Sequence, residues 1–477
     1  MKYADIEQYL VTLAKEGQLL RIKDETKLEP DLGAAARAIN NVAKENAPAL
    51  LFENILGYTN ARVVMNLHGS WPNHALMLGM PKRATLREQF FEFTRRYMTF
   101  PGEVEYRDSA PWQEIAIADP KKINLFDILP LFRLNRHDGG FYLDKACVIS
   151  REPDNPQDFA RQNVGIYRLQ VKGRNRLGIQ PVPSHDIAIH LRQAEERGED
   201  LPIAIAIGNE PIISVVASMP ILYNQSEYEM AGALQGEPYP IVHSEFTGVD
   251  IPWGSEVVLE GKILGRVREA EGPFGEFSGH YSGGRLMPVI EITKVSYRQN
   301  PIYETLYLGM PWTEIDYMIA INTSAPLYAQ LKPSFPEIQA VNAFYTHGLV
   351  VVISTKCRTG GFAKAVGLRV LSTPHGLGYA KVVIVVDETI DPFDLNQVMW
   401  AISTKFNPAD DLVVLPNMSV VSLDPASNPK GITHKMIIDA TTPVAPDIRG
   451  HYSQPLDTPL GTEQWEAKFR EMLNVRA

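Results

Sequence analysis

The spacing of hydrophobic residues changes twice along the chain, and each spacing predicts a different kind of element. Between Asp5 and Gly17, apolar residues recur at helical spacing, with Asp5 in the position of an N-cap and Gly17 in that of a stop. We therefore expect an amphipathic helix packed on a core. Through about residue 115, short apolar stretches at 49–52 and 61–65 accompany a helical pattern at 86–98, which is typical of an α/β lobe.

From about residue 120 to residue 310, strand patterns prevail. Apolar or alternating runs predict strands at 201–208, 212–217, 256–260 and 289–293, and only two clear helices lie among them. Gly and Pro residues separate the runs. This composition favours a β-barrel-like or sandwich-like domain in the middle of the chain.

Beyond about residue 320, apolar strands at 348–354 and 380–387 alternate with a helical stretch at 361–370, which indicates a second α/β domain. In the tail, Thr462 has the position of a helix cap, and Trp465, Phe469 and Met472 share one face. We expect this helix to dock on a neighbouring domain or subunit. The predicted division is an α/β lobe at 1–118, a β-barrel-like domain at 119–315, an α/β domain at 316–455 and a terminal helix at 456–477.

Composition and charge exclude several classes of protein. The chain has 477 residues, 45% of them hydrophobic, which is enough for several domains. Lys and Arg number 46 against 56 Asp and Glu, a net charge of −10, and no basic cluster stands out, so we expect no nucleic-acid partner. No apolar run approaches the ~18 residues of a membrane span, and the start lacks a signal-peptide pattern. We expect a soluble, cytoplasmic protein without a membrane partner.

The chain has only two cysteines, Cys147 and Cys357. Two cysteines in so long a chain exclude a disulfide scaffold and a cysteine-rich metal site. We interpret both as small buried hydrophobic residues rather than nucleophiles.

Four short segments carry residues suited to chemistry. In the first, Asn163 and Arg168 lie five residues apart, so a regular strand would point them to opposite faces. A bulge at Gly165 would bring both to one side. The alternative is an edge strand with a solvated arginine.

The second segment follows two prolines, Pro181 and Pro183, that hold the chain extended. Ser184 is placed to cap a helix that runs to about Arg197, and the free N–H groups of its first turn would attract an anion. His185 in that turn could reach a metal or a phosphate, or it could be an ordinary surface histidine.

The third segment begins a helix at Ser226. Glu229, three residues further on, fits a reciprocal capping box with Ser226, so its carboxylate is occupied at the helix end. Glu227 is left free to point elsewhere. A solvated surface glutamate is the alternative for Glu227.

The fourth segment places Glu271 and Glu276 on either side of Gly-Pro-Phe-Gly. Fully extended, residues five apart would lie about 17 Å from each other, but Pro at the second and Gly at the fourth position favour a turn that brings the carboxylates together. One of two close carboxylates then has a raised pKa and can donate a proton, while the other stays charged. The alternative is an acidic surface loop.

Taken together and in this order, the four segments resemble the UbiD family of reversible decarboxylases, which use prenylated FMN. Three further stretches, at 127–135, 139–145 and 441–447, look like the large C subunit of bacterial hydroxyarylic acid decarboxylases. Those enzymes act on vanillate, 4-hydroxybenzoate, protocatechuate or gallate. The resemblance implies a UbiD-like α/β fold in which a central split β-barrel-like domain binds prenylated FMN and the 316–455 domain mediates oligomerisation.

The resemblance also implies a ligand set. Asn163, His185 and Glu227 would bind Mn²⁺ or Mg²⁺ that bridges to the cofactor phosphate, and the imidazole favours Mn²⁺. Contacts to the flavin would come from the segment Val164, Gly165, Ile166, Tyr167 and Arg168, and from Ser184. By counting back from Glu227, the carbonyls that hold K⁺ in relatives correspond to those of Val216, Ala217 and Met219.

The catalytic arginine and the two glutamates of the family correspond to Arg168, Glu271 and Glu276. Arg168 would hold a carboxylate and the cofactor, Glu271 would pair with Arg168, and Glu276 would deliver the proton that replaces CO₂. The electron sink would belong to the cofactor. Candidate residues of the substrate pocket are Ile319 and His434.

The sequence departs from the ferulic acid decarboxylase relatives at one position. They have a lysine before Ala-Gly-Tyr near the cofactor, whereas this chain has Gly376 in that place. Another group must take over that contact, or the alignment slips there.

The favoured activity is therefore decarboxylation of a small aromatic acid. The alternatives are a polyprenyl-hydroxybenzoate decarboxylase of ubiquinone synthesis, a non-catalytic flavin-binding subunit, and a conventional flavin oxidoreductase. The resemblance further implies a flavin prenyltransferase that supplies the cofactor, a small D-type subunit as a possible partner, and a homo-oligomer, either dimer or hexamer.

Overall fold

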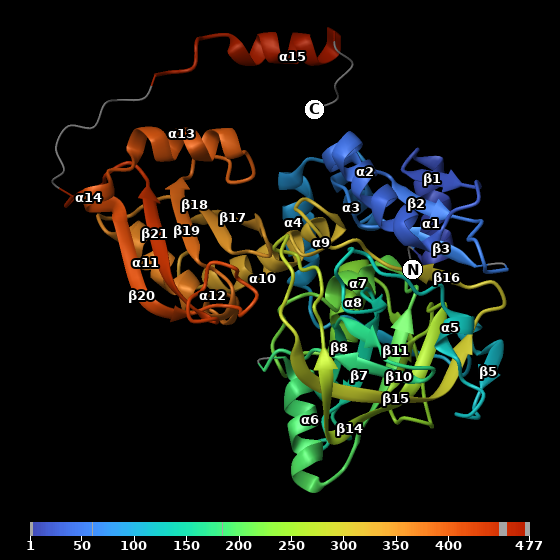
Figure 1. Ribbon diagram of the computed structural model, residues 1–477. Coiled ribbons are helices and arrows are strands. Elements are labelled where there is room, and N and C mark those ends of the chain that lie inside the picture. Colours follow the sequence, from blue (N-terminus) through green and yellow to red (C-terminus); the bar gives the residue numbers. More distant parts are fainter. Residues whose placement is uncertain (1–2, 60, 184, 448–455, 473–477) are drawn as a thin grey trace.

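The computed structural model describes residues 3–59, 61–183, 185–447 and 456–472. Over these residues the chain forms four β-sheets, arranged as an N-terminal region, a middle region and a C-terminal region (Figure 1). None of the described helices combines the length and the apolar character that crossing a membrane requires.

The N-terminal region packs helices on a small sheet whose strand order is β1-β2-β3-β16. The first helix begins after Asp5, whose carboxylate accepts a hydrogen bond from the Gln8 N–H, so the predicted cap is confirmed. The strands are β1 (Leu19–Ile22), β2 (Ala49–Phe52), β3 (Arg62–Met65) and β16 (Ile302–Glu304). The helical elements are α1 (Ile6–Lys15), η1 (Leu28–Leu32), α2 (Gly33–Ala43), η2 (Lys44–Asn46), α3 (Trp71–Met77) and α4 (Leu86–Tyr97).

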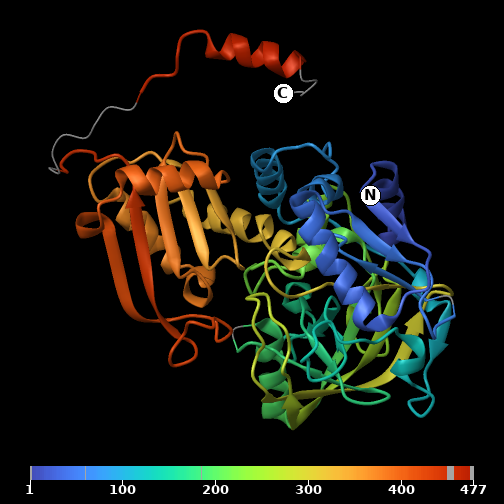
Figure 2. The same cartoon turned by 45° about the horizontal axis from the view of Figure 1, so that its top comes forward.

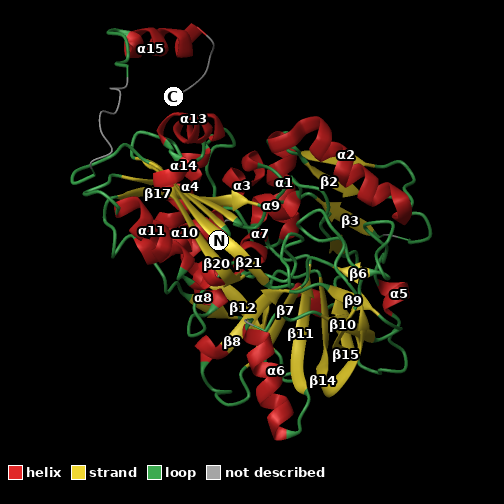
Figure 3. Cartoon of the chain, turned by 60° about the vertical axis from the view of Figure 1, so that its left-hand side comes forward, coloured by secondary structure: helices red, strands yellow, loops and turns green. Residues whose placement is uncertain are grey.

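The middle region is built on a nine-stranded sheet of antiparallel pairs, with the order β6-β9-β10-β15-β14-β11-β7-β8 and β5 beside β15 (Figure 3). The paired strands β14 and β15 shift register twice, and such irregularities bend a sheet. The strands are β5 (Ile115–Ile117), β6 (Tyr142–Leu143), β7 (Cys147–Arg151), β8 (Gln162–Ile166), β9 (Leu169–Val171), β10 (Arg176–Ile179), β11 (Leu201–Ile207), β14 (Val257–Glu271) and β15 (Arg285–Tyr297).

Short helices and a second, three-stranded sheet complete the middle region. The helical elements are η3 (Pro111–Gln113), α5 (Leu125–Ile128), η4 (Phe159–Arg161), α6 (Asp186–Arg197), α7 (Pro211–Val216) and α8 (Glu227–Gln235). The small sheet contains β4 (Val104–Tyr106), β12 (Tyr239–His243) and β13 (Asp250–Pro252). The buried residue Cys147 lies in β7, and Cys357 in the C-terminal region is half-buried.

The predicted strand at 212–217 is wrong, because this stretch is helix α7. Pro211 occupies the first turn, and the Glu210 carboxylate accepts hydrogen bonds from the N–H groups of Ile212 and Ile213. A capped start therefore outweighs the strand preference of the β-branched residues that follow.

The C-terminal region is a five-stranded sheet with the order β17-β18-β19-β21-β20. Helices α10 and α11 pack on one face, and α13 packs on the other. The strands are β17 (Ile338–Tyr345), β18 (Val350–Thr355), β19 (Val382–Asp387), β20 (Leu412–Ser419) and β21 (Ile432–Ala440). The helices are α9 (Glu314–Met318), α10 (Ile321–Leu331), α11 (Phe362–Leu371), α12 (Pro374–Gly378), α13 (Leu395–Lys405) and α14 (Pro408–Asp411).

The three regions share strands and buried charges at their junction. Strand β16, from the predicted middle domain, pairs with β3 of the N-terminal sheet, and β5, from the predicted first lobe, pairs with β15. The Lys145 ammonium lies 2.7 Å from a Glu304 oxygen and 2.5 Å from a Glu314 oxygen, and all three side chains are buried. The domain boundaries expected at 118/119 and 315/316 stay predictions.

The last described helix, α15 (Thr462–Met472), stands apart from the rest of the chain (Figures 1 and 2). Its apolar side chains Trp465, Phe469 and Met472 are exposed, with 55%, 49% and 67% of their surface accessible. Docking of this helix on a neighbouring subunit stays a prediction.

Candidate active site

Arg168 is the centre of a buried ion cluster in the middle region. It follows the end of β8, and its Nε and Nη2 atoms donate to the two carboxylate oxygens of Glu271 at 3.0 and 2.8 Å. Its Nη1 atom donates to Glu276 on the other side. Only 8%, 1% and 6% of the surfaces of these residues are exposed, so the guanidinium is shared by two desolvated carboxylates. The structure thus brings together the three residues that the sequence singled out.

The segment between the two glutamates directs both of them toward Arg168, but the predicted turn at 272–275 is wrong: the nearest turn begins at Glu276, whose carbonyl accepts from the Gly279 N–H. Glu271 ends β14, and the following Gly272 has a φ of +91°, a conformation that suits glycine. The Gly275 N–H donates to the Asp138 carboxylate at 2.8 Å, which anchors this segment. The Phe274 ring lies under the Arg168 guanidinium, with 5.2 Å between its centroid and Cζ. Contacts with Asp138 and Arg168 therefore hold the segment in place.

Burial gives Glu276 the character of a proton donor. It raises the pKa of Glu276 above its usual value, although the charge of Arg168 opposes this effect. A raised pKa keeps a carboxyl group protonated closer to neutral pH, as a general acid requires. The cluster can hold a proton at Glu276 while Arg168 stabilises the carboxylate that its release would leave.

A second group of polar residues surrounds the start of α8 and the strand β8. Glu227 is buried, its Oε2 atom has no hydrogen-bond partner, and no cationic side chain pairs with it among the described residues. Burial therefore raises the pKa of Glu227 well above its usual value. A buried carboxylate without a counter-charge is costly, so the site suits a bound cation.

Tyr167 connects the other two predicted metal ligands. Its hydroxyl donates to Asn163 Oδ1 at 3.4 Å, and its ring lies 5.5 Å from the His185 ring, between centroids. Burial lowers the pKa of His185 to about 4, so its imidazole is neutral at pH 7, the form that binds metals. No group of three or more His, Cys, Asp or Glu side chains suited to a metal occurs in the described ranges. Of the three predicted ligands, only His185 and Glu227 are of these residue types.

Three local expectations about these segments are wrong or lie outside the described residues. Strand β8 pairs with β7 in continuous register through Gly165, so there is no bulge; Arg168 escapes the strand because β8 ends at Ile166. A Cβ on Gly165 would lie 2.6 Å from the Tyr167 ring, so this glycine makes room for Tyr167. His185 itself is the N-cap residue of α6, one position before the helix, and Ser184 lies outside the described residues.

Ser226 caps α8 as predicted, since its hydroxyl accepts from the N–H groups of Tyr228 and Glu229 at 3.2 and 3.5 Å. The second hydrogen bond of the predicted capping box, from the Ser226 N–H to the Glu229 carboxylate, is not formed within the described chain. The carbonyls proposed for K⁺ all accept backbone hydrogen bonds: Val216 from Met219, Ala217 from Ile166, and Met219 from Ile221. A carbonyl oxygen has a second lone pair, so these contacts leave the K⁺ prediction open.

The two candidate pocket residues lie in different surroundings. Ile319 is buried in the hydrophobic core after α9, whereas His434 on β21 is exposed. The side chain of the next residue, Lys435, is buried and donates to the Gly376 and Leu377 carbonyls. Within the described chain, no hydrogen bond, ion pair or ring contact joins Ile319 or His434 to the Arg168 cluster. Their roles in a substrate pocket stay predictions.

Several residues beside the cluster escaped the sequence analysis. The Tyr142 hydroxyl donates to Glu271 Oε1 at 3.1 Å. The ring of Phe277, next to Glu276, lies 4.8 Å from the His347 ring, which in turn lies 4.8 Å from Tyr379. Burial, with the Glu276 charge, raises the pKa of Tyr379 to about 12. Phe277 adjoins Glu276 in the sequence, whereas Tyr142, His347 and Tyr379 come from distant parts of the chain, so no local pattern places them beside the cluster.

The fold and the site together define the class of protein. Three family models match the chain: the Rift-related, C-terminal and N-terminal domains of 3-octaprenyl-4-hydroxybenzoate carboxy-lyase, at residues 104–311, 316–440 and 10–92. The chain belongs to the UbiD family of carboxy-lyases. The predictions of an enzyme and of a UbiD-like fold are therefore confirmed, with the middle sheet curled as a half-barrel.

Individual relatives match over almost the whole chain. A phenolic acid decarboxylase of Bacillus subtilis is 65% identical over 99% of this chain and 100% of its own length. The vanillic acid decarboxylase ShVdcCD of Sedimentibacter hydroxybenzoicus, solved in a closed form, has a TM-score of 0.92 and 53% identity over 99% of both chains. An evolved dimeric form of the UbiD-class enzyme HmfF from Pelotomaculum thermopropionicum, in complex with prFMN, has a TM-score of 0.81 and 29% identity over 97% of this chain and 98% of its own.

Proposed function

We propose that this protein catalyses the reversible, non-oxidative decarboxylation of a hydroxyarylic acid to the corresponding phenol and CO₂. The proposed substrates are of the vanillate, 4-hydroxybenzoate, protocatechuate or gallate type. The observation that carries this proposal is the arginine shared by two buried carboxylates, one of which is suited to donate a proton. The relatives named phenolic acid decarboxylase and vanillic acid decarboxylase support the substrate class.

In the proposed reaction, the bond between the ring and the carboxylate breaks, and CO₂ leaves. Glu276 transfers its proton to the ring carbon that held the carboxylate, and the resulting Glu276 carboxylate is stabilised by Arg168. Glu271 takes no proton; its bidentate contact fixes the orientation of the guanidinium. Protonation of Glu276 from solvent then restores the starting state, and the reverse sequence carboxylates a phenol.

The proposed cofactor is prenylated FMN, which when bound supplies the electron sink that an aromatic ring lacks. Asn163, His185 and Glu227 would hold Mn²⁺ or Mg²⁺ at its phosphate. The orphaned, buried Oε2 of Glu227 and the neutral imidazole of His185 fit a divalent cation. The backbone of 164–168 and Ser184 would contact the flavin, and the carbonyls of Val216, Ala217 and Met219 would hold K⁺.

The proposed partners follow the same logic. A flavin prenyltransferase would supply the cofactor, and a small D-type subunit and further copies of this chain would complete the assembly as a dimer or hexamer. The name ShVdcCD of the Sedimentibacter enzyme supports a D partner. The exposed apolar face of α15 supports contacts between copies.

The proposal is tested by expressing the protein with and without a flavin prenyltransferase. The loss of each of the four acids is followed by liquid chromatography under anaerobic conditions, with a polyprenyl-hydroxybenzoate as a fifth substrate. We expect turnover of at least one small acid, and only after co-expression. Turnover of the polyprenyl acid alone would favour the ubiquinone-pathway alternative, which the name of the family models suggests. A bound flavin without turnover of any acid would contradict the proposal and favour a binding subunit.

A further inference from the structure

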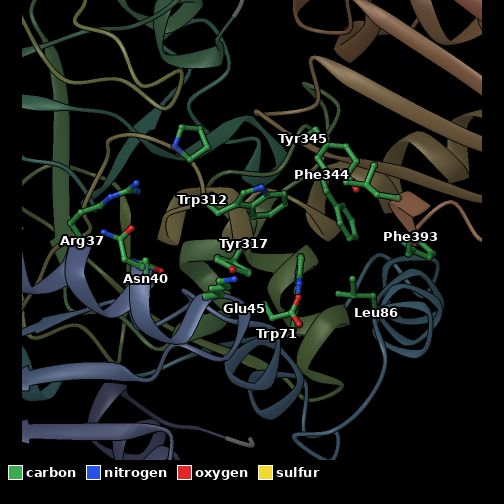
Figure 4. Close-up of a pocket in the computed structure, with 14 residues that line it drawn as sticks. Arg37, Asn40, Glu45, Trp71, Leu86, Trp312, Tyr317, Phe344, Tyr345 and Phe393 are labelled. Carbon is green, nitrogen blue, oxygen red and sulfur yellow. The ribbon is translucent and has the colours of Figure 1, made fainter. Parts of the chain in front are cut away.

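A cavity of about 500 Å³ lies where the three regions of the chain meet, and none of its lining residues belongs to the Arg168 cluster (Figure 4). Its walls come from α2, η2 and α3 of the N-terminal region, from the 311–317 segment, and from the end of β17. This volume lies within the ~300–1,000 Å³ range of small-molecule sites. The proposed reaction leaves this cavity without a role.

One side of the cavity is aromatic. The Trp71 ring contacts the rings of Tyr317, Phe344 and Trp312 at centroid distances of 5.0, 5.1 and 6.3 Å. Figure 4 shows these side chains turned toward the same space. A cluster of ring edges and faces around a cavity favours an aromatic ligand, because aromatic pairs gain energy beyond the area that they bury.

Two cationic side chains, the half-buried Arg37 and the exposed Lys44, also line the cavity. Arg37 donates from Nη1 to the Met310 carbonyl at 2.5 Å, and Lys44 lies at the end of α2. Within the described part of the chain, neither cation has a carboxylate within 4 Å, although the protein has ten more acidic than basic residues. Two unpaired cations beside aromatic walls suit a ligand that carries a carboxylate.

A hydrogen-bond acceptor, the exposed Glu45, also lines the cavity. Its charge acts on the Tyr317 hydroxyl. A ligand hydroxyl group could donate to this carboxylate while the ligand carboxylate meets the cations. A plain aromatic acid would leave this acceptor unused.

We propose that this cavity is a second binding site, separate from Arg168, for a small aromatic carboxylate that bears a hydroxyl group. Two segments that line the cavity also contact residues near Glu276. The ring of Phe344 lines the cavity, and three residues later the His347 ring contacts Phe277, the neighbour of Glu276. Pro311 lines it as well and packs close to Gly279 of the segment that carries Glu276. A ligand in the cavity would thus contact two segments, those of Phe344 and Pro311, that also pack against residues next to Glu276.

The experiment measures binding of 4-hydroxybenzoate to the full chain, purified without a flavin prenyltransferase, by calorimetry and by quenching of tryptophan fluorescence. An Arg168→Ala background removes the reaction site, so failure of the proposed function does not affect the result. In Leu86→Trp the new indole fills the cavity, and Lys44→Gln removes one cation. Arg87→Gln is the matched control, because Arg87 neighbours Leu86 on α4 but does not line the cavity.

We expect one binding event that Arg168→Ala and Arg87→Gln leave unchanged. Leu86→Trp should weaken it by about tenfold or more, and Lys44→Gln by about threefold to tenfold, which corresponds to ~0.7–1.4 kcal/mol. 4-Hydroxybenzyl alcohol, which lacks the carboxylate, should also bind about tenfold more weakly. Absence of binding, its loss in Arg168→Ala, or binding as tight as that of the native chain in both Leu86→Trp and Lys44→Gln would overturn the proposal.

Discussion

The ammonium group of Lys435, on β21, donates hydrogen bonds to the carbonyls of Gly376 and Leu377 in α12. The resemblance aligns Gly376 with a lysine of the ferulic acid decarboxylases, or the alignment slips at this position. A Cβ on Gly376 would lie 1.9 Å from the Val370 carbonyl oxygen, so no side chain fits at this position. Lys435 therefore joins β21 to α12 through two hydrogen bonds.

This contact fixes side chains that reach the Arg168 cluster. His375 in α12 stacks on Tyr379 with 5.3 Å between ring centroids, and Tyr379 lies against His347. The His347 ring in turn contacts Phe277 beside Glu276. Lys435 is therefore a positioning residue in the wall of the proposed site.

Lys435→Met is expected to change the dependence of stability on pH. Burial lowers the pKa of Lys435 to about 8, below the ~10.4 of an unfolded lysine. The unfolded chain therefore binds more protons between about pH 8 and pH 10, so this residue makes stability rise with pH in that window. Urea unfolding at several pH values should show that slope in the native protein and lose it in Lys435→Met. Lys430→Met, at an exposed position, is the control and should keep the slope.

Arg168→Lys is expected to inactivate the enzyme although it preserves the charge. An ammonium group cannot make the two parallel bonds that the guanidinium makes to Glu271 while also reaching Glu276. We expect kcat/KM to fall by about 10²-fold or more, with little change in thermal stability. Arg176→Lys, which replaces a surface partner of Glu269, should leave kcat/KM within about twofold. Activity near the native level in Arg168→Lys would contradict the proposed role of the two parallel bonds from the guanidinium to Glu271.

Glu276→Gln is expected to remove the proton donor. The pKa of Glu276 is raised by burial, so the donor form persists to higher pH than in an ordinary glutamate and is lost as pH rises through that raised pKa. The decarboxylation rate should fall on the alkaline side of this pKa, and Glu276→Gln should lower kcat by about 10²–10⁴-fold. Glu269→Gln, in the same hairpin and half-exposed, is the control. A rate that rises with pH through this range would argue against Glu276 as the acid.

Glu227→Gln is expected to abolish a stabilising effect of Mn²⁺. In the metal-free protein burial raises the pKa of Glu227 and disfavours its charged form, so replacing the carboxyl group by a neutral amide should leave thermal stability equal or higher. Added Mn²⁺ should raise the Tm of the native protein, because it binds only the folded state, but not the Tm of Glu227→Gln. Glu229→Gln, two residues along α8, should retain the response. Binding of Mn²⁺ is followed independently by electron paramagnetic resonance, and unchanged binding in Glu227→Gln would disprove the ligand assignment.

Lys145→Met is expected to destabilise the junction of the three regions. It leaves the Glu304 and Glu314 carboxylates buried without their shared cation. Breaking a buried pair in this way costs about 3–5 kcal/mol of unfolding free energy. Lys262→Met, which removes an exposed pair with Asp200, should cost only ~0–1 kcal/mol. Chemical unfolding of the two variants measures the difference, and equal stabilities would show that the buried cluster contributes little.

Local signals in the sequence were sufficient for many elements. The N-cap at Asp5, the helix end at Arg197 and the cap at Ser226 lie where the chain's own residues place them, because helix ends depend on neighbours within one turn. The same reasoning failed at 212–217. There, side chains that favour strands follow a capping glutamate and a proline, and the capped helix start outweighs their strand preference.

The sequence by itself determined the candidate cluster in outline. The residues and their resemblance pointed to Arg168, Glu271 and Glu276, although the turn expected at 272–275 is not formed and the Gly275 N–H bonds to Asp138 instead. Only the tertiary structure decided what faces the two glutamates: Arg168 lies more than a hundred positions away, and Tyr142 is further still. Lys435, His347 and the cavity at Trp71 likewise depend on how the three regions pack. Contacts between distant segments arise from burial of many side chains at once, which no short pattern encodes.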